Sequence, residues 1–584
     1  MKSQFAHPMK RKNLSLFSFL IVFINLSPLF AQFKQTIPNR AILLQNAEKL
    51  VPLKRLDDIK IAVITPSSSK YDAFIDMVGR YADVKTFDFN HYDEQTKYFN
   101  TIIVAGTDAD LRSDLLLKLR QSIVNKKQVI LVRFGTAAAQ QSWTGNLKAG
   151  GLSEMRYPEF DKPAQEYAAM SIFGGMAITE GKLKTEQTRI QYVDGRGSGV
   201  DIAKMTTKID AIAAEAIQQR ATPGMVVMAV KNGQVIFEKA YGSHTYAQTQ
   251  PTKIDDIFDL ASVSKIMGTT PVVMNLQERG IILLDSTMGH YLGQAKQSNK
   301  KDITLRTVLL HEAGFTPFIP FYKNLKPGDL QRFKDPKHEV TVADSAYLLN
   351  NYYRDIMWPE MLKSAVKPPG NYVYSDISMY VMKEIAEHET AEPMNQYVQK
   401  LLYRPIGMKT AGYNPRERFV KERMVPTEKD TSFRKVLLQG YVHDQGAAMA
   451  GGVAGHAGLF SSANDLAIYG QLLLNRGTYG GVRYFRQETV DLFTSRQSKT
   501  SRRGLGFDRY DPDAKKGYPS KLANPSVYGH TGYTGTCIWI DPQNQLVYIF
   551  LSNRVHPQVS NKLYDLNIRS RIQDAIYESI HQAK

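Results

Sequence analysis

The chain has 584 residues, of which 43% are hydrophobic and 22% are charged, and its lysines and arginines outnumber its aspartates and glutamates by 74 to 56, a net charge of +18. This length predicts two to four domains with ordinary cores, and the composition excludes a mostly disordered, collagen-like or multi-span membrane chain. Cys537 is the one cysteine in the sequence, so neither an internal disulfide nor a cysteine-based metal site can form.

The amino terminus accounts for part of the positive charge. Basic residues precede any acidic one, an apolar run from Leu14 to Phe30 follows, and the small residue Ala31 comes next. This order is typical of a secretory signal peptide, residues 1–31. An uncleaved anchor is the alternative, but the run contains Asn25 and Pro28, and a comfortable span needs about 20 apolar residues. We expect an exported protein, periplasmic or secreted, with membrane contact through this segment if at all.

Residues 37–195 alternate strand patterns with helical ones. Four β-branched runs predict buried strands, at residues 60–65, 84–89, 101–105 and 128–132. A helical pattern covers residues 111–125. Such alternation predicts an open α/β sandwich built on a parallel sheet. The glycine-rich stretch from Asp194 to Gly199 predicts a linker, and so a domain boundary near residue 200.

Parts of this first region resemble the carboxy-terminal domain of family 3 glycoside hydrolases. The resembling segments are Asn39–Asn46, Val51–Leu53, Ala164–Tyr167, Ile172–Gly175 and Gly181–Leu183. The barrel domain that carries the catalytic carboxylate of that family would have to precede this region, where we find only the signal segment. The resemblance therefore implies a retained scaffold or docking domain, and we do not expect glycosidase chemistry.

Residues 200–584 open with a helical pattern from Asp201 to Arg220. Two strand patterns then meet around Asn232-Gly233, a strong hairpin signal because both residues tolerate positive φ. A long helical region follows, and strand patterns return near residues 526–552. The order predicts a sheet with helices packed on it.

The first chemical motif is Ser262-x-x-Lys265, at the start of an apolar helical pattern in which Pro271 predicts a kink or offset. Residues i and i+3 share a helix face, so the amine can meet the hydroxyl. A lysine whose pKa is lowered by burial can help to remove the serine proton, and the helix amino terminus favours the alkoxide. Serines with a lysine three residues on also occur in polar or loop-like stretches, at positions 67, 298, 364 and 432. A plain helix cap is the alternative for Ser262.

The second motif is Tyr374-x-Asp376, just before a helical pattern at 379–387. A tyrosine poised between a lysine and a serine hydroxyl can act as a base, because the nearby cation stabilises the phenolate. The alternative is a core ring with a hydrated hydroxyl, since tyrosine often has such neighbours by chance.

The third motif is His530-Thr531-Gly532, followed by Tyr533 and a strand pattern at 538–540. Glycine lets a substrate lie against a strand edge without a Cβ clash. The amide of Tyr533 can then pair with the amide of Ser262 as an oxyanion hole. A turn entering a strand is the alternative.

In this chain order the three motifs resemble those of serine β-lactamases and penicillin-binding proteins. They look closest to the class C β-lactamase-like branch, which includes esterases and D-amino-acid peptidases. The segment from Thr304 to His311 supports the likeness. The resemblance implies an α/β and α+β chain, in which the amino-terminal α/β sandwich is followed by a β-lactamase-like antiparallel sheet with flanking helices and a helical subdomain.

The same resemblance implies roles for single residues. Ser262 would be the acylated nucleophile, Lys265 its activator and Tyr374 the general base. Five residues would contact substrate: Asp376, His530, Thr531, Gly532 and Tyr533. Asp376 stands where class C β-lactamases usually have asparagine, and His530 where they have lysine, so the charge that meets a substrate carboxylate differs. Both departures are familiar in the esterase and peptidase relatives and argue against a dedicated β-lactamase.

A glycine-rich stretch from Val442 to Phe460 resembles a segment near the mouth of the cleft in that branch. His456 within it either touches substrate or bonds to backbone, and we favour the backbone role. His443 and His456 lack zinc-type spacing with a third ligand, so we predict no metal and no other cofactor.

The expected partner is a small molecule or a muropeptide. Arg496, Lys499, Arg502 and Arg503 form a basic stretch, but no nucleic-acid-binding module accompanies them, and we favour a solvated face. We therefore expect an exported serine hydrolase that cleaves an amide or ester bond, with peptidoglycan-derived muropeptides as the leading substrates. An esterase or D-amino-acid peptidase, and a catalytically idle binding protein for wall fragments, are the alternatives. The oligomeric state is left open.

Overall fold

The protein is described by a computed structural model, which covers residues 40–66, 69–111, 113–135, 151–195 and 197–580. The signal peptide predicted at residues 1–31 lies outside these ranges. Within them, no helix combines the length and the apolar character that crossing a bilayer requires.

The first region contains a six-stranded sheet in the order β1-β6-β5-β4-β2-β3. Its strands are β1 (Ile42–Asn46), β2 (Ile61–Thr65), β3 (Val84–Asp88), β4 (Thr101–Thr107), β5 (Gln128–Phe134) and β6 (Leu152–Tyr157). β2 to β6 pair in parallel, as predicted, whereas β1 pairs antiparallel with β6. All four predicted strands are present, but β3 is partly exposed and not buried as predicted. The sequence patterns did not predict β1 and β6, because polar residues such as Gln45 and Glu154 interrupt them.

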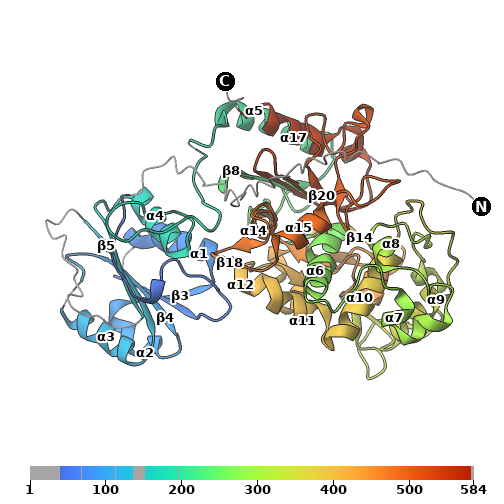
Figure 1. The fold of residues 1–584 in the computed structure, drawn as a ribbon, viewed down its shortest axis with the longest axis horizontal. Coiled ribbons are helices and arrows are strands. Elements are labelled where there is room, and N and C mark those ends of the chain that lie inside the picture. The colour runs from blue at the N-terminus through green and yellow to red at the C-terminus, as the bar shows by residue number, and fades with distance from the viewer. Residues whose placement is uncertain (1–39, 67–68, 112, 136–150, 196, 581–584) are drawn as a thin grey trace, which may run out of the picture. The chain divides into compact units, whose positions relative to one another are not determined.

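Both faces of this sheet are buried at β2, β4 and β5, which explains the continuous apolar runs of those strands. Along β2, Ile61 and Val63 belong to one hydrophobic cluster and Ala62 and Ile64 to another, because side chains alternate between the two faces of a strand. The first cluster includes residues of α1 (Asp72–Tyr81) and α4 (Lys162–Phe173), and the second includes residues of α3 (Ser113–Val124). Figure 1 shows these helices around the sheet, with α2 (Tyr92–Thr96) close to α3.

The second region contains a six-stranded sheet in the order β19-β20-β21-β22-β7-β8, and every neighbouring pair is antiparallel. Its strands are β7 (Gly224–Lys231), β8 (Gln234–Gly242), β19 (Asp508–Arg509), β20 (Tyr528–Thr531), β21 (Cys537–Asp541) and β22 (Leu546–Ser552). Asn232 and Gly233 both have positive φ, 52° and 74°. The predicted hairpin between β7 and β8 is therefore confirmed.

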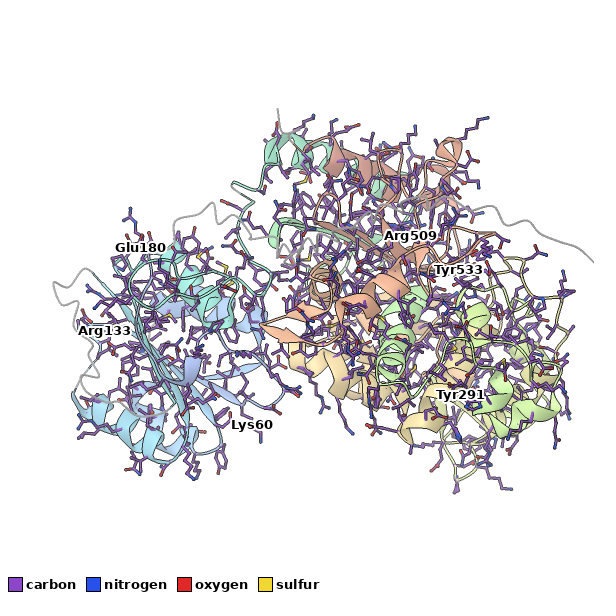
Figure 2. All side chains as sticks on the ribbon, viewed as in Figure 1. Lys60, Arg133, Glu180, Tyr291, Arg509 and Tyr533 are labelled. Carbon is purple, nitrogen blue, oxygen red and sulfur yellow. The ribbon has the colours of Figure 1, made fainter. Side chains whose placement is uncertain are left out.

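This second sheet is also covered on both faces. Along β7, Val226 and Met228 join one core cluster, and Met225 and Val227 join the other. The latter cluster includes residues of α5 (Ile202–Gln218) and α17 (Ile568–Tyr577), while α14 (Ala463–Leu474) packs on the opposite face. A Cβ added at Gly470 of α14 would lie 2.5 Å from Val547 of β22, so glycine sets how closely this helix approaches the sheet. Figure 2 shows the side chains that fill these layers.

The helical region lies between the sequence segments that build the second sheet. It contains α6 (Thr270–Glu278), α7 (Met288–Tyr291), α8 (Leu305–Leu309), α9 (Trp358–Lys363), α10 (Ile377–Thr390), α11 (Met394–Val398), α12 (Arg404–Ile406) and α13 (Gln445–Met449). α15 (Gln487–Thr494) and α16 (Lys562–Asp565) follow later in the chain.

Shorter strands complete the described elements. They are β9 (Phe258–Asp259), β10 (Leu330–Gln331), β11 (Val340–Ala343), β12 (Ala346–Leu348), β13 (Gly412–Tyr413), β14 (Pro426–Lys429), β15 (Leu437–Gln439), β16 (Leu459–Ser461), β17 (Thr478–Tyr479) and β18 (Val482–Arg483). The mixed α/β and α+β class predicted from the sequence is thus observed. The domain boundary near residue 200 stays a prediction.

Candidate active site

Ser262 lies in the first turn of a helical segment that continues to the end of α6. It belongs to a 3-10 turn, Ala261–Val263, which is followed by a π-helical turn, Lys265–Thr269, and then by α6. Pro271 stands in the first turn of α6 and has no N–H to donate to the turn before it. The carbonyls of Ile266 and Met267 in that turn accept the hydroxyls of Tyr469 and Tyr403. The irregular turns before Pro271 are the local offset that the sequence predicted.

Two groups meet at the hydroxyl of Ser262. Lys265 Nζ and Tyr374 Oη each lie 3.0 Å from Ser262 Oγ. The Lys265 ammonium also lies over the Tyr374 ring, 4.9 Å from its centroid. The lysine is fully buried, whereas Ser262 and Tyr374 are partly exposed. The structure therefore joins two motifs more than 100 residues apart in one hydrogen-bonded group that solvent can reach.

The resting protonation of this group differs from the sequence expectation. Burial favours a lower pKa for Lys265, but the Asp376 carboxylate, 2.8 Å from Nζ, and Tyr374 outweigh burial and raise that pKa. Burial raises the pKa of Tyr374, although the positive charges of Lys265 and Arg503 act to lower it. At neutral pH the site thus holds an ammonium and a neutral phenol. The lowered lysine pKa assumed from the Ser262-x-x-Lys265 motif is wrong.

Asp376 and the glycine-rich stretch complete the surroundings of Lys265. Lys265 Nζ donates to the backbone carbonyl of His456 at 3.2 Å as well as to Asp376. A Cβ at Gly455 would lie 1.9 Å from the carbonyl oxygen of Met379, so the turn that carries this acceptor can approach α10 only with glycine there. The ring of His456 bonds to the Asp444 carboxylate, so the backbone bond favoured for this side chain is not observed among the described residues.

The ring of His456 takes part in a second contact. Its Nε2 lies 2.9 Å from Asp444 Oδ1, and its ring packs on Tyr380 with 4.5 Å between centroids. Asp376, Asp444 and His456 offer ligand atoms within 4.8 Å of one another, an arrangement that could hold a metal ion and that the sequence did not predict. The Lys265 ammonium already supplies a positive charge to Asp376, which disfavours a second cation there.

The third motif lies on β20 beside the nucleophile segment. His530 Nδ1 lies 2.7 Å from the carbonyl oxygen of Thr531, and its Nε2 lies 3.2 Å from Arg503 Nη1. A carbonyl can only accept and a guanidinium can only donate, so Nδ1 carries the proton and Nε2 the lone pair. Burial and the charges of Arg503 and Lys265 lower the pKa of His530 to about 3. His530 is therefore neutral where class C enzymes have a charged lysine.

Arg503 supplies the charge that His530 lacks. It is 4% exposed, donates from Nη2 to Tyr372 Oη at 2.9 Å, and lies over the Tyr374 ring. The carboxylate of Asp508 lies 3.7 Å from its Nε but is engaged by Arg502 through both oxygens. The basic stretch interpreted as a solvated face thus places one of its arginines inside the site. No spacing rule would have identified it from the sequence.

Gly532 and Tyr533 lie where β20 meets the nucleophile segment. A Cβ at Gly532 would lie 2.3 Å from the carbonyl oxygen of Leu260. The hydroxyls of Thr534 and Thr536 donate to the carbonyls of Asp259 and Leu260 at 2.7 and 3.0 Å. Glycine is required here by this packing of protein on protein, which holds the segments that carry the Ser262 and Tyr533 amides together. The Tyr533 side chain is 49% exposed (Figure 2).

Asp259 is a further residue that the sequence analysis missed. Its buried carboxylate accepts the amide of Ala261 at 2.9 Å and the amide of His443 at 2.6 Å. Ala261 has φ of 46°, in the left-handed region that alanine rarely adopts. Asp259 therefore holds the strained backbone immediately before Ser262.

Comparison with known proteins agrees with this geometry. A family model described as Beta-lactamase matches residues 209–571. The chain belongs to the beta-lactamase family. A relative from Escherichia coli O157:H7, named "Putative D-alanyl-D-alanine carboxypeptidase", is 31% identical over 366 residues, which cover 58% of this chain and 80% of the relative. A relative of the same name from Salmonella typhimurium is 30% identical over 374 residues, 59% of this chain and 82% of the relative.

Solved structures are also similar to this beta-lactamase-family protein. Simvastatin Synthase (LovD) from Aspergillus terreus shares 18% identity, with a TM-score of 0.49, over 65% of this chain and 99% of that one. A Beta-Lactamase/D-Alanine Carboxypeptidase from Pseudomonas syringae shares 17%, with a TM-score of 0.48, over 63% and 98%. The family and its named relatives make this protein a serine hydrolase. The family 3 glycoside hydrolase resemblance of residues 37–195 stays a prediction.

Proposed function

We propose that this protein is an exported hydrolase that cleaves amide or ester bonds through an acyl-enzyme on Ser262, with peptidoglycan-derived muropeptides as its substrates. The convergence of Lys265 and Tyr374 on Ser262 Oγ, both at 3.0 Å, carries the proposal. An inert serine at a helix start needs only a backbone partner, whereas this one has two groups that can exchange protons with it.

The proposed reaction has two halves. In acylation, Ser262 Oγ attacks the substrate carbonyl carbon and passes its proton to Tyr374 in its phenolate form, and Lys265 stabilises that phenolate. The C–N or C–O bond then breaks, and the proton leaves with the amine or alcohol. In deacylation, the Tyr374 phenolate takes a proton from a water molecule that attacks the ester carbonyl. The bond to Ser262 Oγ then breaks and Tyr374 returns the proton to that oxygen, which releases the acid and restores Ser262. The Ser262 and Tyr533 amides would stabilise the oxyanion in both halves.

The substrate class follows from the charge beside the serine. Arg503 is a buried guanidinium next to His530 and Tyr374, and a guanidinium binds a carboxylate with strong charge-assisted hydrogen bonds. A peptide that ends in a free carboxylate beside its scissile amide would be attracted by this charge. The relatives named as D-alanyl-D-alanine carboxypeptidases support this substrate class, because their named substrate has that terminus. An exported protein would meet peptides with this terminus in the peptide stems of muropeptides.

The test is hydrolysis of defined muropeptides by the purified protein without residues 1–31. We expect release of amino acid or peptide from muramyl peptides, and loss of this activity in Ser262→Ala. Ser432→Ala is the matched control, since it alters an exposed serine that also has a lysine three residues on. Full turnover by Ser262→Ala would overturn the mechanism.

The two rivals predicted from sequence are tested with the same preparations. An esterase of the same site would give a higher kcat/KM on short acyl nitrophenyl esters than on muropeptides. A catalytically idle binding protein would bind wall fragments but show no Ser262-dependent labelling by a fluorophosphonate. The close approach of Tyr374 and Lys265 to the serine favours turnover over idle binding.

A further inference from the structure

Two adjacent residues, His311 and Glu312, follow the end of helix α8, and His311 has an unusual backbone conformation. His311 has φ of 57°, and the amide of Glu312 donates to the carbonyl of Thr307 at 2.8 Å. This position after a helix is normally taken by glycine or asparagine, because a Cβ is unfavourable in the left-handed region. A buried histidine there keeps a strained backbone, so its side chain needs an explanation.

The side chain of His311 contacts the segment that carries Tyr374. Its Nδ1 accepts the amide of Ser375 at 3.2 Å, and its ring lies on the Tyr374 ring with 4.6 Å between centroids. The carbonyl of His311 accepts the amide of Val373 at 2.8 Å. The amides on either side of Tyr374 are thus both bound by one residue, and the phenol ring rests against the imidazole.

The acceptor role of His311 requires a neutral ring. Burial, together with the charges of Arg503 and Lys265, holds its pKa well below the usual value. The lone pair on Nδ1 is therefore free to accept the Ser375 amide, and the proton is on Nε2. In the described part of the chain this Nε2 is buried and has no hydrogen-bond partner, so the ring is held by its contacts with the tyrosine segment.

Glu312 contacts the segment that leads to Arg503. Its buried Oε1 accepts the hydroxyl of Ser498 and lies 2.9 Å from the hydroxyl of Thr500. Ser498 Oγ in turn accepts the amides of Thr500 and Ser501 at 3.1 and 2.7 Å. The carbonyl of Arg503 accepts the amides of residues 497 and 498. The loop of residues 497–503 is therefore closed by hydrogen bonds to the Arg503 carbonyl, and it is bound to the carboxylate of Glu312.

The backbone of Glu312 connects the Tyr374 segment with the loop that leads to Arg503. Its carbonyl accepts the amide of Gly370 at 2.8 Å, four residues before Tyr374. The hydroxyl of Thr500 also lies 3.1 Å from the carbonyl of Gly370. One dipeptide thus touches the segment of the proposed base and the segment of the proposed carboxylate-binding cation.

We propose that His311 and Glu312 are positioning residues, His311 for Tyr374 and Glu312 for Arg503. The proposal rests on the proposed function for the chemistry of those two groups. His311 sets the phenol against Ser262 and so governs acylation of every substrate. Glu312 sets the guanidinium and so governs binding of substrates with a carboxylate. The two residues are adjacent, yet their loss should affect different kinetic constants.

The first experiment changes the acceptor of His311. His311→Phe keeps a flat ring but leaves the Ser375 amide unpaired, and we expect the acylation rate by a fluorophosphonate to fall by about 100-fold, the cost of a misplacement of about 1 Å. His311→Asn puts an amide oxygen near the place of Nδ1 and tolerates positive φ, so it should stay within about tenfold of wild type. His388→Phe, at an exposed position of α10, is the matched control and should change nothing.

The second experiment changes the carboxylate of Glu312. Glu312→Leu should raise KM for a D-alanine-terminated peptide by about tenfold or more and leave kcat/KM for a neutral nitrophenyl ester nearly unchanged, because the neutral ester does not need the cation. Glu312→Gln keeps an oxygen acceptor for the Ser498 hydroxyl and should preserve most of the binding. Thermal unfolding of each variant identifies any that fails to fold.

A readout independent of turnover separates this proposal from the proposed function. A fluorotyrosine installed at position 374 should show a shifted or broadened fluorine resonance in His311→Phe and an unchanged one in His388→Phe. If the wild type proves unreactive, the proposed function fails, while the resonance still tests the positioning of Tyr374. Folded His311→Phe and Glu312→Leu proteins with wild-type acylation, KM and resonance would overturn the proposal.

Discussion

Two buried cations, Lys265 and Arg503, lie over the ring of Tyr374, and they differ in how their charge is balanced. Lys265 Nζ lies 2.8 Å from the carboxylate of Asp376, so its charge is largely neutralised inside the protein. The carboxylate nearest to Arg503, that of Asp508, lies 3.7 Å away and is bound by Arg502 through both oxygens. The first cation thus has one carboxylate to itself, whereas the second shares the Asp508 carboxylate with Arg502 and keeps part of its charge for a ligand.

This difference predicts different roles for Lys265 and Arg503. A cation paired with a carboxylate can store a proton and hold a hydroxyl, but it adds little to the attraction of an anionic substrate. A poorly paired cation costs stability until an anion arrives. We therefore expect the Lys265 side to govern the chemical step and the Arg503 side to govern substrate choice. The predictions below test this division.

Removal of Arg503 should have the largest selective effect. In Arg503→Gln, kcat/KM on a D-alanine-terminated peptide should fall by about 100-fold, as for loss of a buried charge-assisted contact worth about 3 kcal/mol. A neutral ester makes no such contact and should lose less, only through the higher pKa of Tyr374 that follows the loss of the Arg503 charge. Arg503→Lys is the control that keeps the charge but loses the planar fork. Equal losses on both substrates would contradict the division.

Neutralising Asp376 should change the pH dependence of acylation. The Asp376 carboxylate raises the pKa of Lys265 and also raises that of Tyr374. Acylation needs a deprotonated base, so the rate rises with pH through these pKa values. In Asp376→Asn both pKa values fall, and the rise should move to lower pH. The measurement is the pH profile of fluorophosphonate labelling, and a profile that stays in place or moves to higher pH would refute the coupling.

His530 should respond to Arg503 without itself becoming charged in the working range. Its pKa is lowered to about 3, with burial as the main cause and Arg503 as the next. It should stay neutral from about pH 5 to 8 in the wild type, and its pKa should rise in Arg503→Gln. Nitrogen NMR of labelled histidine gives both the protonation and the tautomer. A charged His530 at pH 7 in the wild type would contradict the assignment.

A change remote from both cations should separate stability from chemistry. A Cβ at Gly470 would lie 2.5 Å from Val547, between α14 and β22. Gly470→Ala should therefore lower the free energy of unfolding by about 1 to 3 kcal/mol through overpacking. The pH profile and the substrate preference should not change. Chemical denaturation gives the stability, and an unaltered midpoint would mean that α14 adjusts without cost.

Much of the fold was predictable because both sheets have two buried faces. Continuous apolar runs identified β2, β4 and β5, and Asn232-Gly233 identified the β7–β8 hairpin. β6 was not predictable from apolar pattern, since Glu154 in it is buried and pairs with Arg133 of β5. A strand stabilised by buried ion pairs has no apolar period to detect.

The candidate site was predictable only where motif and spacing coincide. Ser262, Lys265 and Tyr374 come together as the resemblance implied. Arg503 and His311 were missed as functional residues because their partners lie about 130 and 64 residues away, and no local pattern encodes such contacts. The protonation states were also beyond the sequence, because they depend on which of Asp376, Arg503 and burial dominates in space.

The central claim is that the Ser262 hydroxyl is the nucleophile. The most direct test is labelling of the folded protein by a fluorophosphonate or a fluorescent penicillin, followed by mass mapping of the modified peptide. The account predicts one adduct, on the peptide that contains Ser262, present in Ser432→Ala and absent in Ser262→Ala. An adduct on another residue, or undiminished labelling of Ser262→Ala, would contradict it.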